Sequence, residues 1–310
     1  MELLVLSRAE VEELLDLGQL LAALRDGFMA LTAGEVTAPG RNELTMPDEA
    51  FLLGMPGRLR DGVMTVKVVT VFESHDPSHL ATIGLYDQRT GACRAFMDGT
   101  YITAIRTSAA AAVATDLLAR EDARTLAIVG AGVQGEHHLR VFGLVREFDD
   151  IRVSSLDRAD AERVAALHPR AHVADDPEAA VRGADVVALA THAAQPVIDP
   201  SWIAPGTHVS SVGYRPPDGE LPRELLRGRL FVETREAFEP TPVGCAELQG
   251  RNARDATELG EVLLGRAPGR TDAREITVYK AMGHVVEDIV AADLVYAEAV
   301  RNTAGIVIAL

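Results

Sequence analysis

The chain has 310 residues, of which 47% are hydrophobic and 25% charged, and its formal net charge is −16 at pH 7. This length suits two domains of ordinary size, each with its own hydrophobic core. The excess of acids and the lack of a Lys/Arg cluster exclude nucleic acid as an expected partner, because binding to phosphates needs grouped cations. A single cation inside an apolar segment of so acidic a protein therefore needs a reason.

The cysteines and the N-terminus bear on location. Cys93 and Cys245 are too few for a disulfide framework, and they lack the paired spacing of a zinc site. The first residues include acids where a signal peptide needs a basic segment, and no apolar run approaches the ~18 residues of a membrane span. We therefore expect a cytoplasmic protein with no membrane partner and no metal site.

The first part of the chain, residues 1–117, reads as an α+β domain. A helical pattern covers residues 7–31, a stretch punctuated by Pro and Gly follows, and strand-like runs occupy 62–72 and 81–87. Lys67 interrupts the β-branched residues of the first of these runs. An unpaired ammonium buried there would cost several kcal/mol or lose its proton. Either Lys67 faces a cavity, where it meets a substrate carboxylate or transfers a proton, or the strand lies at an edge and Lys67 reaches water.

Arg106 presents the same problem in a predicted interior helix rich in small residues. It is the only charge between Asp98 and Asp116. A guanidinium binds a carboxylate or phosphate in a bidentate manner, which favours a substrate contact; the alternative is a structural pair with an interior acid such as Asp98.

The most specific motif begins the second part of the chain. A buried strand over 125–130 leads into Gly130-x-Gly132-x-x-Gly135, a helix is predicted over 136–147, and a second strand follows over 151–155. In such a βαβ unit the first glycine makes the turn, the second lets the backbone approach a pyrophosphate, and the third lets the helix pack on its strand. The motif predicts a dinucleotide cofactor; a glycine-rich turn without a ligand is the alternative.

The choice between NAD and NADP stays open. Ser155 stands where an acid would bind the ribose of NAD, Asp157 could take that role if the strand ends later, and Arg158 could meet the 2′-phosphate of NADP. Equally, Asp157 and Arg158 could simply open the next helix.

Strands alternate with helices through the rest of the chain, at 185–190, 208–212, 230–233 and 276–280. This alternation predicts a doubly wound, parallel Rossmann sheet over residues 118–289. A helix over 285–301 and a short apolar segment at 305–310 follow, and we expect residues 290–310 to return to the first domain.

At these residues the sequence resembles the ornithine cyclodeaminase/mu-crystallin family over nearly its whole length. The matching stretches are Met55-Pro56, Lys67-Val-Val69, Ala95-Phe-Met-Asp-Gly99, Thr103-Ala-Ile-Arg-Thr107, Leu118-Ala-Arg120, Gly130-Ala-Gly-Val-Gln134, Ser211-Val-Gly213 and Glu287-Asp288.

The resemblance implies a homodimer whose first domain supplies the interface and the substrate pocket, facing a domain that binds NAD or NADP. It implies that Arg41, Lys67 and Arg106 hold the substrate carboxylate, although Arg41 by itself reads as a solvated loop residue. The residues assigned to the cofactor are Thr107, Gly130, Gly132, Val133, Gln134, Gly135, Ser155, Asp157, Arg158, Thr191, Val212 and Gly213.

Two departures concern the substrate. True ornithine cyclodeaminases carry an acid before the Leu-Met-Pro segment and a catalytic Asp after the fifth Rossmann strand; here those places hold Leu53 and Arg215. Asp218 could replace the second acid if the loop is displaced. In the late Lys-Ser-x-Gly motif, Ala281 stands where the Ser is usual.

Together these features predict an NAD(P)-dependent oxidoreductase that moves a hydride to or from the α-carbon of an amino or imino acid, of the ketimine reductase or amino-acid dehydrogenase type. Lys67 is the candidate catalytic residue, as proton donor or acceptor. The alternatives are ornithine cyclodeamination, which returns its hydride, and a non-enzymatic NADPH-dependent binder of small ligands.

Overall fold

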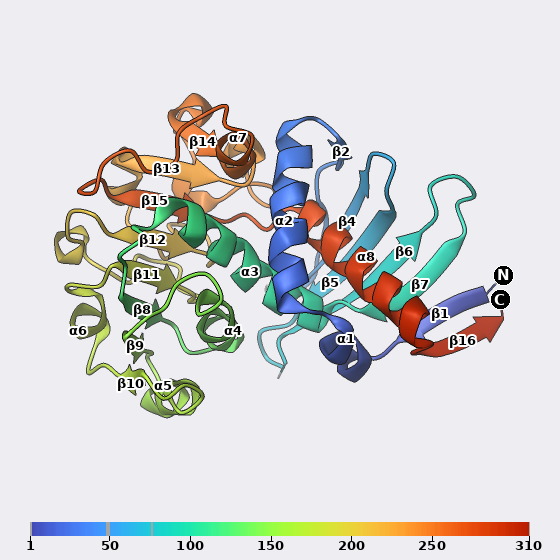
Figure 1. The fold of residues 1–310 in the computed structure, drawn as a ribbon, viewed down its shortest axis with the longest axis horizontal. Helices are drawn as coiled ribbons and strands as arrows, with labels where there is room; N and C mark the ends of the chain where they lie inside the picture. The colour runs from blue at the N-terminus through green and yellow to red at the C-terminus, as the bar shows by residue number, and fades with distance from the viewer. Residues whose placement is uncertain (1, 48–49, 76, 310) are drawn as a thin grey trace. The chain divides into compact units, whose positions relative to one another are not determined.

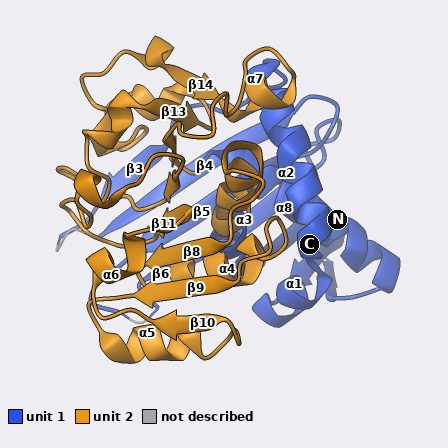
Figure 2. Ribbon diagram, turned by 60° about the vertical axis from the view of Figure 1, so that its left-hand side comes forward, with its two compact units in different colours: residues 1–106, 284–310 blue, residues 107–283 orange. Residues whose placement is uncertain are grey.

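The structure, a computed structural model, describes residues 2–47, 50–75 and 77–309. The chain divides into two compact units (Figure 2): residues 1–106 with 284–310 form unit 1, and residues 107–283 form unit 2. The sequence placed these divisions at 117/118 and 289/290. The first difference arises because one continuous helix, α3 (Thr100–Leu118), contributes its first residues to unit 1 and the rest to unit 2.

Among the described residues, unit 1 contains an eight-stranded mixed sheet in the order β16-β1-β7-β6-β5-β4-β2, with β3 also paired to β4 (Figure 1). Its strands are β1 (Glu2–Leu6), β2 (Val36–Thr37), β3 (Asn42–Thr45), β4 (Phe51–Leu59), β5 (Met64–Val71), β6 (His79–Tyr86), β7 (Cys93–Asp98) and β16 (Ile306–Ala309). The strand-like runs at 62–72 and 81–87 are β5 and β6. Sequence reasoning missed β4 because Gly54, Pro56 and Gly57 interrupt it. The C-terminal β16 pairs antiparallel with β1.

Helices α1 (Arg8–Leu14), α2 (Leu17–Thr32) and α8 (Val285–Asn302) also belong to unit 1. The helix predicted over 7–31 is two helices, because Ser7 caps α1 and Asp16 caps α2 through their side-chain oxygens. Helix α8 packs on β4, β5 and β6, and α2 packs on α8. Along β5, Thr65, Lys67 and Val69 are buried, whereas Val66 on the other face is 37% exposed.

Unit 2 is the predicted Rossmann fold. Its sheet has the order β10-β9-β8-β11-β12-β15-β13-β14, and every pairing among its described strands is parallel. The strands are β8 (Thr125–Val129), β9 (Asp150–Ser154), β10 (Ala171–Val173), β11 (Val186–Leu189), β12 (His208–Ser211), β13 (Arg229–Val232), β14 (Ala256–Glu258) and β15 (Thr277–Lys280). Sequence reasoning missed β10 and β14, because three residues are too few to show a periodicity.

The helices of unit 2 after α3 are α4 (Val133–Phe142), α5 (Arg158–Ala165), α6 (Pro177–Val181) and α7 (Leu259–Leu263). Short 3-10 helices lie in the connections: η1 (Pro200–Trp202), η2 (Leu225–Arg227), η3 (Arg235–Phe238), η4 (Ala246–Leu248) and η5 (Ala253–Asp255). The prediction of a helix over 136–147 was wrong at both ends. Gly132 is the N-cap of α4, so the helix starts inside the glycine motif, and Gly143 ends it.

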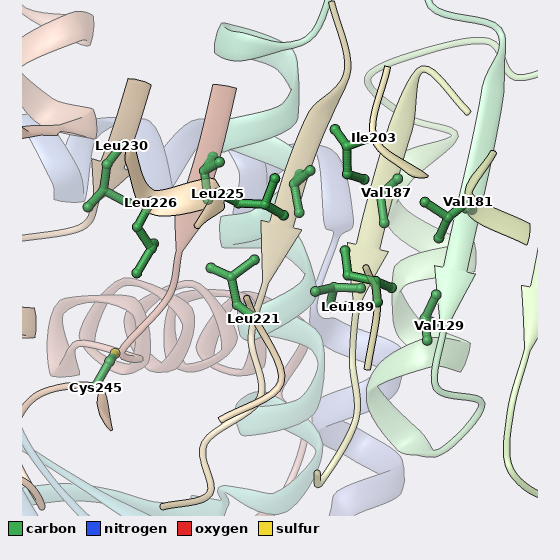
Figure 3. Packing of buried hydrophobic residues seen from close by; sticks show 14 of the residues in the cluster. Val129, Val181, Val187, Leu189, Ile203, Leu221, Leu225, Leu226, Leu230 and Cys245 are labelled. Carbon is green, nitrogen blue, oxygen red and sulfur yellow. The ribbon is translucent and has the colours of Figure 1, made fainter. Parts of the chain in front are cut away.

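One hydrophobic cluster fills the face of the unit 2 sheet shown in Figure 3. Val129, Val187 and Leu189 come from the strands, and Leu221 and Leu225 come from the irregular segment after β12. Because that segment has little regular structure, burial of its leucines fixes its position on the sheet.

Candidate functional site

The glycine-rich turn of unit 2 has the geometry that the sequence predicts. Gly130 has φ +104°, a conformation that L side chains rarely adopt, and a Cβ there would lie 2.4 Å from the carbonyl oxygen of Ala190. A Cβ on Gly135 would lie 1.9 Å from the carbonyl oxygen of Gly130. The first glycine thus makes the turn, and the third lets α4 approach β8.

Gly132 differs from these two, because a Cβ there would meet nothing within 4 Å. It is the N-cap of α4 and has no side chain to accept the first N–H groups of the helix, which begins with Val133 and Gln134. An uncapped helix N-terminus with open space at the second glycine fits the pyrophosphate of a dinucleotide. The residues present therefore fit the cofactor that the motif predicts.

Helix α3 lies beside this turn within unit 2. The Ser108 hydroxyl donates to Gln134 Oε1 at 3.2 Å, and it lies 3.1 Å from Nδ1 of the buried His138. Thr107 directly precedes Ser108 on α3. Its assignment to the cofactor phosphates stays a prediction, which this adjacency supports.

The residues after β9 form the start of α5. Asp157 is the N-cap of α5 and accepts the N–H of Ala159 at 2.8 Å. Arg158 is exposed and pairs with Glu162 at 3.1 Å between Nε and Oε1. Both residues open the next helix, and Ser155 precedes them in a half-buried position.

The segments after β11 and β12 converge on the glycine turn. A Cβ on Gly130 would lie 3.0 Å from Thr191 Cγ2, and a Cβ on Gly213 would lie 2.6 Å from the carbonyl oxygen of Thr191. The N–H of Val212 donates to the carbonyl of Leu189, which continues the ladder past the strands. Gly130, Thr191 and Gly213 are therefore neighbours at the carboxyl edge of the sheet, where ligands of such folds bind.

Unit 1 contains the two cations that the sequence singled out. Lys67 is 1% exposed, on an interior strand between β4 and β6, where Met55 and Ile83 are its direct neighbours. The alternative of an edge strand with Lys67 in water was wrong. Its Nζ lies 2.7 Å from Asp288 Oδ2, in the first turn of α8.

Arg106 shares this partner. Its Nε lies 3.0 Å from Asp288 Oδ1, and its Nη1 lies 2.6 Å from Glu287 Oε2. The alternative of a structural pair with an interior acid is confirmed in part: Arg106 pairs with two interior acids, but these are Glu287 and Asp288. Asp98 instead accepts the N–H of Tyr101 at the start of α3. Two cations and two carboxylates, all buried, thus form one compact cluster, which we call the Lys67–Asp288 cluster.

The cluster changes the proton affinities of its members. Burial, assisted by the charge of Arg106, lowers the pKa of Lys67 to about 8, although Asp288 acts in the opposite direction. Burial alone would raise the pKa of Asp288, but Arg106 and Lys67 more than offset it and hold that pKa below its usual value. Lys67 can therefore gain or lose a proton near neutral pH while Asp288 stays ionised.

Arg41 and His284 adjoin the same cluster. The charge of Arg41 contributes to lowering the pKa of Lys67. Burial, followed by Arg41, lowers the pKa of His284 to about 4, so this ring is neutral at pH 7. Its Nδ1 accepts the N–H of Val286 at 3.1 Å, which leaves the proton on Nε2. The three predicted substrate cations thus lie in one region of unit 1.

The two positions that depart from true ornithine cyclodeaminases are also described. Leu53 is buried in an apolar cluster with Val69, Val71 and Ala81. Arg215 follows β12, with its Nη1 3.5 Å from the carbonyl oxygen of His192. Asp218 is exposed. No acid stands at Leu53 to accept a substrate ammonium.

Sequence reasoning gave no role to several buried charges of the two units. Glu287 and Asp288 were noted only as a matching stretch, yet they are charges in an apolar helix, and a charge inside an apolar segment is the signal that singled out Lys67. Lys280, at the end of an apolar strand, shows the same signal. Glu220 does not, because it lies in an irregular, partly polar segment.

The described residues contain no group of three or more His, Cys, Asp or Glu side chains that could hold a metal ion. Within the same ranges, no helix is long and apolar enough to cross a membrane.

A parallel sheet with an uncapped glycine turn at its carboxyl edge defines a dinucleotide-binding Rossmann unit. The model of the ornithine cyclodeaminase/mu-crystallin family matches residues 1–303. The chain belongs to this family.

Relatives of known identity agree. The chain is 38% identical over 272 residues to ketimine reductase mu-crystallin of Mus musculus, which covers 85% of each protein. The structure of Thermococcus litoralis Δ1-pyrroline-2-carboxylate reductase, in complex with NADH and L-proline, superposes with a TM-score of 0.91 at 32% identity, covering 98% of this chain and 99% of that one. An archaeal alanine dehydrogenase dimer with bound NAD superposes with a TM-score of 0.89 at 26% identity, covering 100% of both chains.

Proposed function

We propose that this protein reduces the C=N bond of a small or cyclic α-imino acid, with NAD(P)H as the hydride donor. At the coarser level it is an NAD(P)-dependent oxidoreductase that acts at the α-carbon of amino or imino acids. The observation that carries the finer proposal is the Lys67–Asp288 cluster, because it places a proton-bearing amine of pKa about 8 beside an Arg in the substrate unit.

The residues of the chain divide the work as follows. NAD(P)H, when bound, supplies the hydride to the α-carbon. Arg106, held by Glu287 and Asp288, presents a fixed guanidinium to the substrate carboxylate, and Arg41 adds a second cation. Reduction also needs a proton on the imine nitrogen, and the Lys67 ammonium holds one. Asp288 keeps Lys67 in place and charged until the proton leaves.

The nature of the substrate side chain follows from Leu53. An ornithine ammonium needs a carboxylate, and leaving it unpaired in a pocket costs on the order of 2–5 kcal/mol. Leu53 with its apolar neighbours offers none. We therefore assign the protein a substrate without a side-chain ammonium, such as the cyclic imine of proline.

The proposed role of Lys67 predicts a pH dependence of kcat/KM for imine reduction, which reports the free enzyme. Reduction needs the ammonium form, so kcat/KM falls as the pH rises through about 8. Dehydrogenation of the amino acid needs the neutral amine, so its kcat/KM rises over the same range.

Two variants separate the roles of the cations. Lys67→Met keeps the length and removes the proton, so it lowers kcat and abolishes the inflection near pH 8. Arg106→Lys keeps the charge but cannot bind a carboxylate through two parallel N–H donors, so kcat/KM drops roughly ten- to a hundredfold. The inflection of the pH profile near pH 8 remains. Near-wild-type kinetics in both variants would mean that the cluster is only structural.

We also propose that the protein is a homodimer formed through unit 1. The sheet face opposite the helices carries exposed apolar residues on several strands: Leu44, Val66, Leu80 and Phe96. Val66, Gly84 and Phe96 stand opposite one another in register, so they form one row on that face. The related alanine dehydrogenase described as a dimer supports this assignment. The cytoplasmic location stays a prediction of the sequence.

A further inference from the structure

Unit 2 contains a second group of buried charges, at the carboxyl ends of β11, β12 and β15. Glu220, Glu247 and Lys280 are each 2% exposed or less. A buried carboxylate is costly unless hydrogen bonds or a cation compensate it, so each must be held by specific partners.

Glu220 accepts hydrogen bonds from two separate segments. Its Oε2 accepts the N–H and the hydroxyl of Thr191, both at 2.7 Å. Its Oε1 accepts the Ser211 hydroxyl at 2.8 Å and the N–H of Gly213 at 2.7 Å. Thr191 follows β11, whereas Ser211 ends β12 and Gly213 follows it, so one carboxylate joins the ends of two adjacent strands.

Lys280 supports this arrangement from β15. Its Nζ donates to the Ser211 hydroxyl at 3.1 Å and to the carbonyl oxygen of Gly213 at 2.6 Å, and it lies 2.8 Å from Glu247 Oε1. The Ser211 hydroxyl can thus accept from Lys280 while it donates to Glu220. Leu221, which directly follows Glu220, is packed in the hydrophobic cluster of Figure 3, so this segment of the chain is anchored on the sheet.

The location of these segments gives the group a function. In a Rossmann fold the dinucleotide lies across the carboxyl edge, with its adenosine half over the first strands and its other half over the strands beyond the switch point. The glycine turn follows β8, and β11 and β12 lie on the side of β8 away from β9. The segments joined by Glu220 therefore belong to the half that receives the nicotinamide.

The bonds to Glu220 also occupy the donors of those segments. Both N–H groups, of Thr191 and Gly213, and the Thr191 hydroxyl point to the carboxylate. The segments after β11 and β12 therefore contribute to the cofactor site through the shape of their backbone and not through these donors. This shape depends on the Glu220 carboxylate.

We propose that Glu220 is a positioning residue for the nicotinamide half of the cofactor. Its carboxylate sets the distance between the segments after β11 and β12, and it does not touch the cofactor. This inference rests on the proposed function, because it requires that NAD(P)H binds at the glycine turn.

Glu220→Gln tests the inference, since the amide has the same shape but cannot accept all four hydrogen bonds. The dissociation constants of NAD(P)H and of ADP-ribose, which lacks the nicotinamide, are measured by titration calorimetry. We expect NAD(P)H to bind at least about tenfold more weakly, while ADP-ribose stays within about twofold. A merely structural role would weaken both ligands equally.

Glu233→Gln is the matched control. Glu233 is also fully buried and accepts the Tyr279 hydroxyl at 2.9 Å and the N–H of Met282 at 2.8 Å, but it follows β13, farther along the sheet. We expect its affinities for both ligands to match the wild type. If Glu220→Gln does not fold, Ser211→Ala removes one of the four donors and shifts the ratio of the two affinities in the same direction, by about threefold.

The outcomes are distinct. An unchanged ratio of NAD(P)H to ADP-ribose affinity in Glu220→Gln, or in Ser211→Ala where that variant replaces it, overturns the inference and leaves the proposed function standing. A wild-type protein that binds neither ligand overturns the proposed function, and the inference with it.

Discussion

Lys67 and Arg106 illustrate what a single residue can reveal. Each is a lone cation in an apolar segment, and each is buried in the folded protein. The prediction that both charges need a partner is therefore confirmed. The partners lie in the first turn of α8, 181 and 182 residues after Arg106, and farther still along the chain from Lys67. A sequence shows the unbalanced charge but not the distant acid that neutralises it.

The first residue-scale prediction concerns Asp288→Asn. The change leaves Lys67 and Arg106 buried with one carboxylate in place of two. Because removing one member of a buried ion cluster leaves uncompensated charge, we expect the free energy of unfolding to drop by about 3–5 kcal/mol in urea titrations. The control is Glu162→Gln, which removes an exposed partner of Arg158 and should change the free energy of unfolding by less than about 0.5 kcal/mol. Equal, small effects would show that the cluster does not stabilise unit 1.

At the scale of elements, the glycine turn was the most predictable feature. The motif, its strand and its neighbouring strands all follow from short-range patterns, and unit 2 has the predicted parallel sheet. The boundary of α4 was not predictable from periodicity, because the helix starts at Gly132, inside the motif. The hydrogen bonds by which Glu220 joins the segments after β11 and β12 were not predictable either, because they are tertiary contacts.

Gly132 gives an element-scale prediction about the cofactor. A Cβ at this position meets nothing, and its φ of −76° suits any residue, so Gly132→Val should leave the melting temperature within a few degrees of the wild type. The branched side chain occupies the space of the pyrophosphate, so NAD(P)H binding should be lost.

Gly143→Val, at the other end of α4, is the control, because a Cβ there also meets nothing and φ is −62°. It should bind NAD(P)H like the wild type in fluorescence titrations. Undiminished affinity in Gly132→Val would refute the assignment of the cofactor site.

At the scale of the whole molecule, the apolar face of the unit 1 sheet predicts association. Phe96 is 43% exposed in the middle of that face. Phe96→Glu places a charge where two copies would meet, so in sedimentation velocity we expect this variant to sediment as a monomer and the wild type as a dimer. Leu144→Glu in unit 2, where Leu144 is 53% exposed, should leave the dimer intact. If Phe96→Glu remains a dimer, the interface does not lie on this face of the unit 1 sheet.

The presence of two units could be predicted from the sequence, because the pattern of predicted secondary structure changes along the chain from α+β to alternating strands and helices. What the sequence could not provide is the path of the C-terminal segment, whose α8 carries both acids of the Lys67–Asp288 cluster back to unit 1. Long-range return of a helix depends on packing, which no local pattern encodes.

The most direct test of the central claim compares two reactions of the purified protein. With the cyclic imine of proline and NAD(P)H, we predict that reduced cofactor is oxidised in a one-to-one ratio with the amino acid formed. With L-ornithine and a catalytic amount of NAD, we predict no appreciable proline. Proline formed rapidly from ornithine without net change of the cofactor, together with no turnover of the imine, would contradict the account.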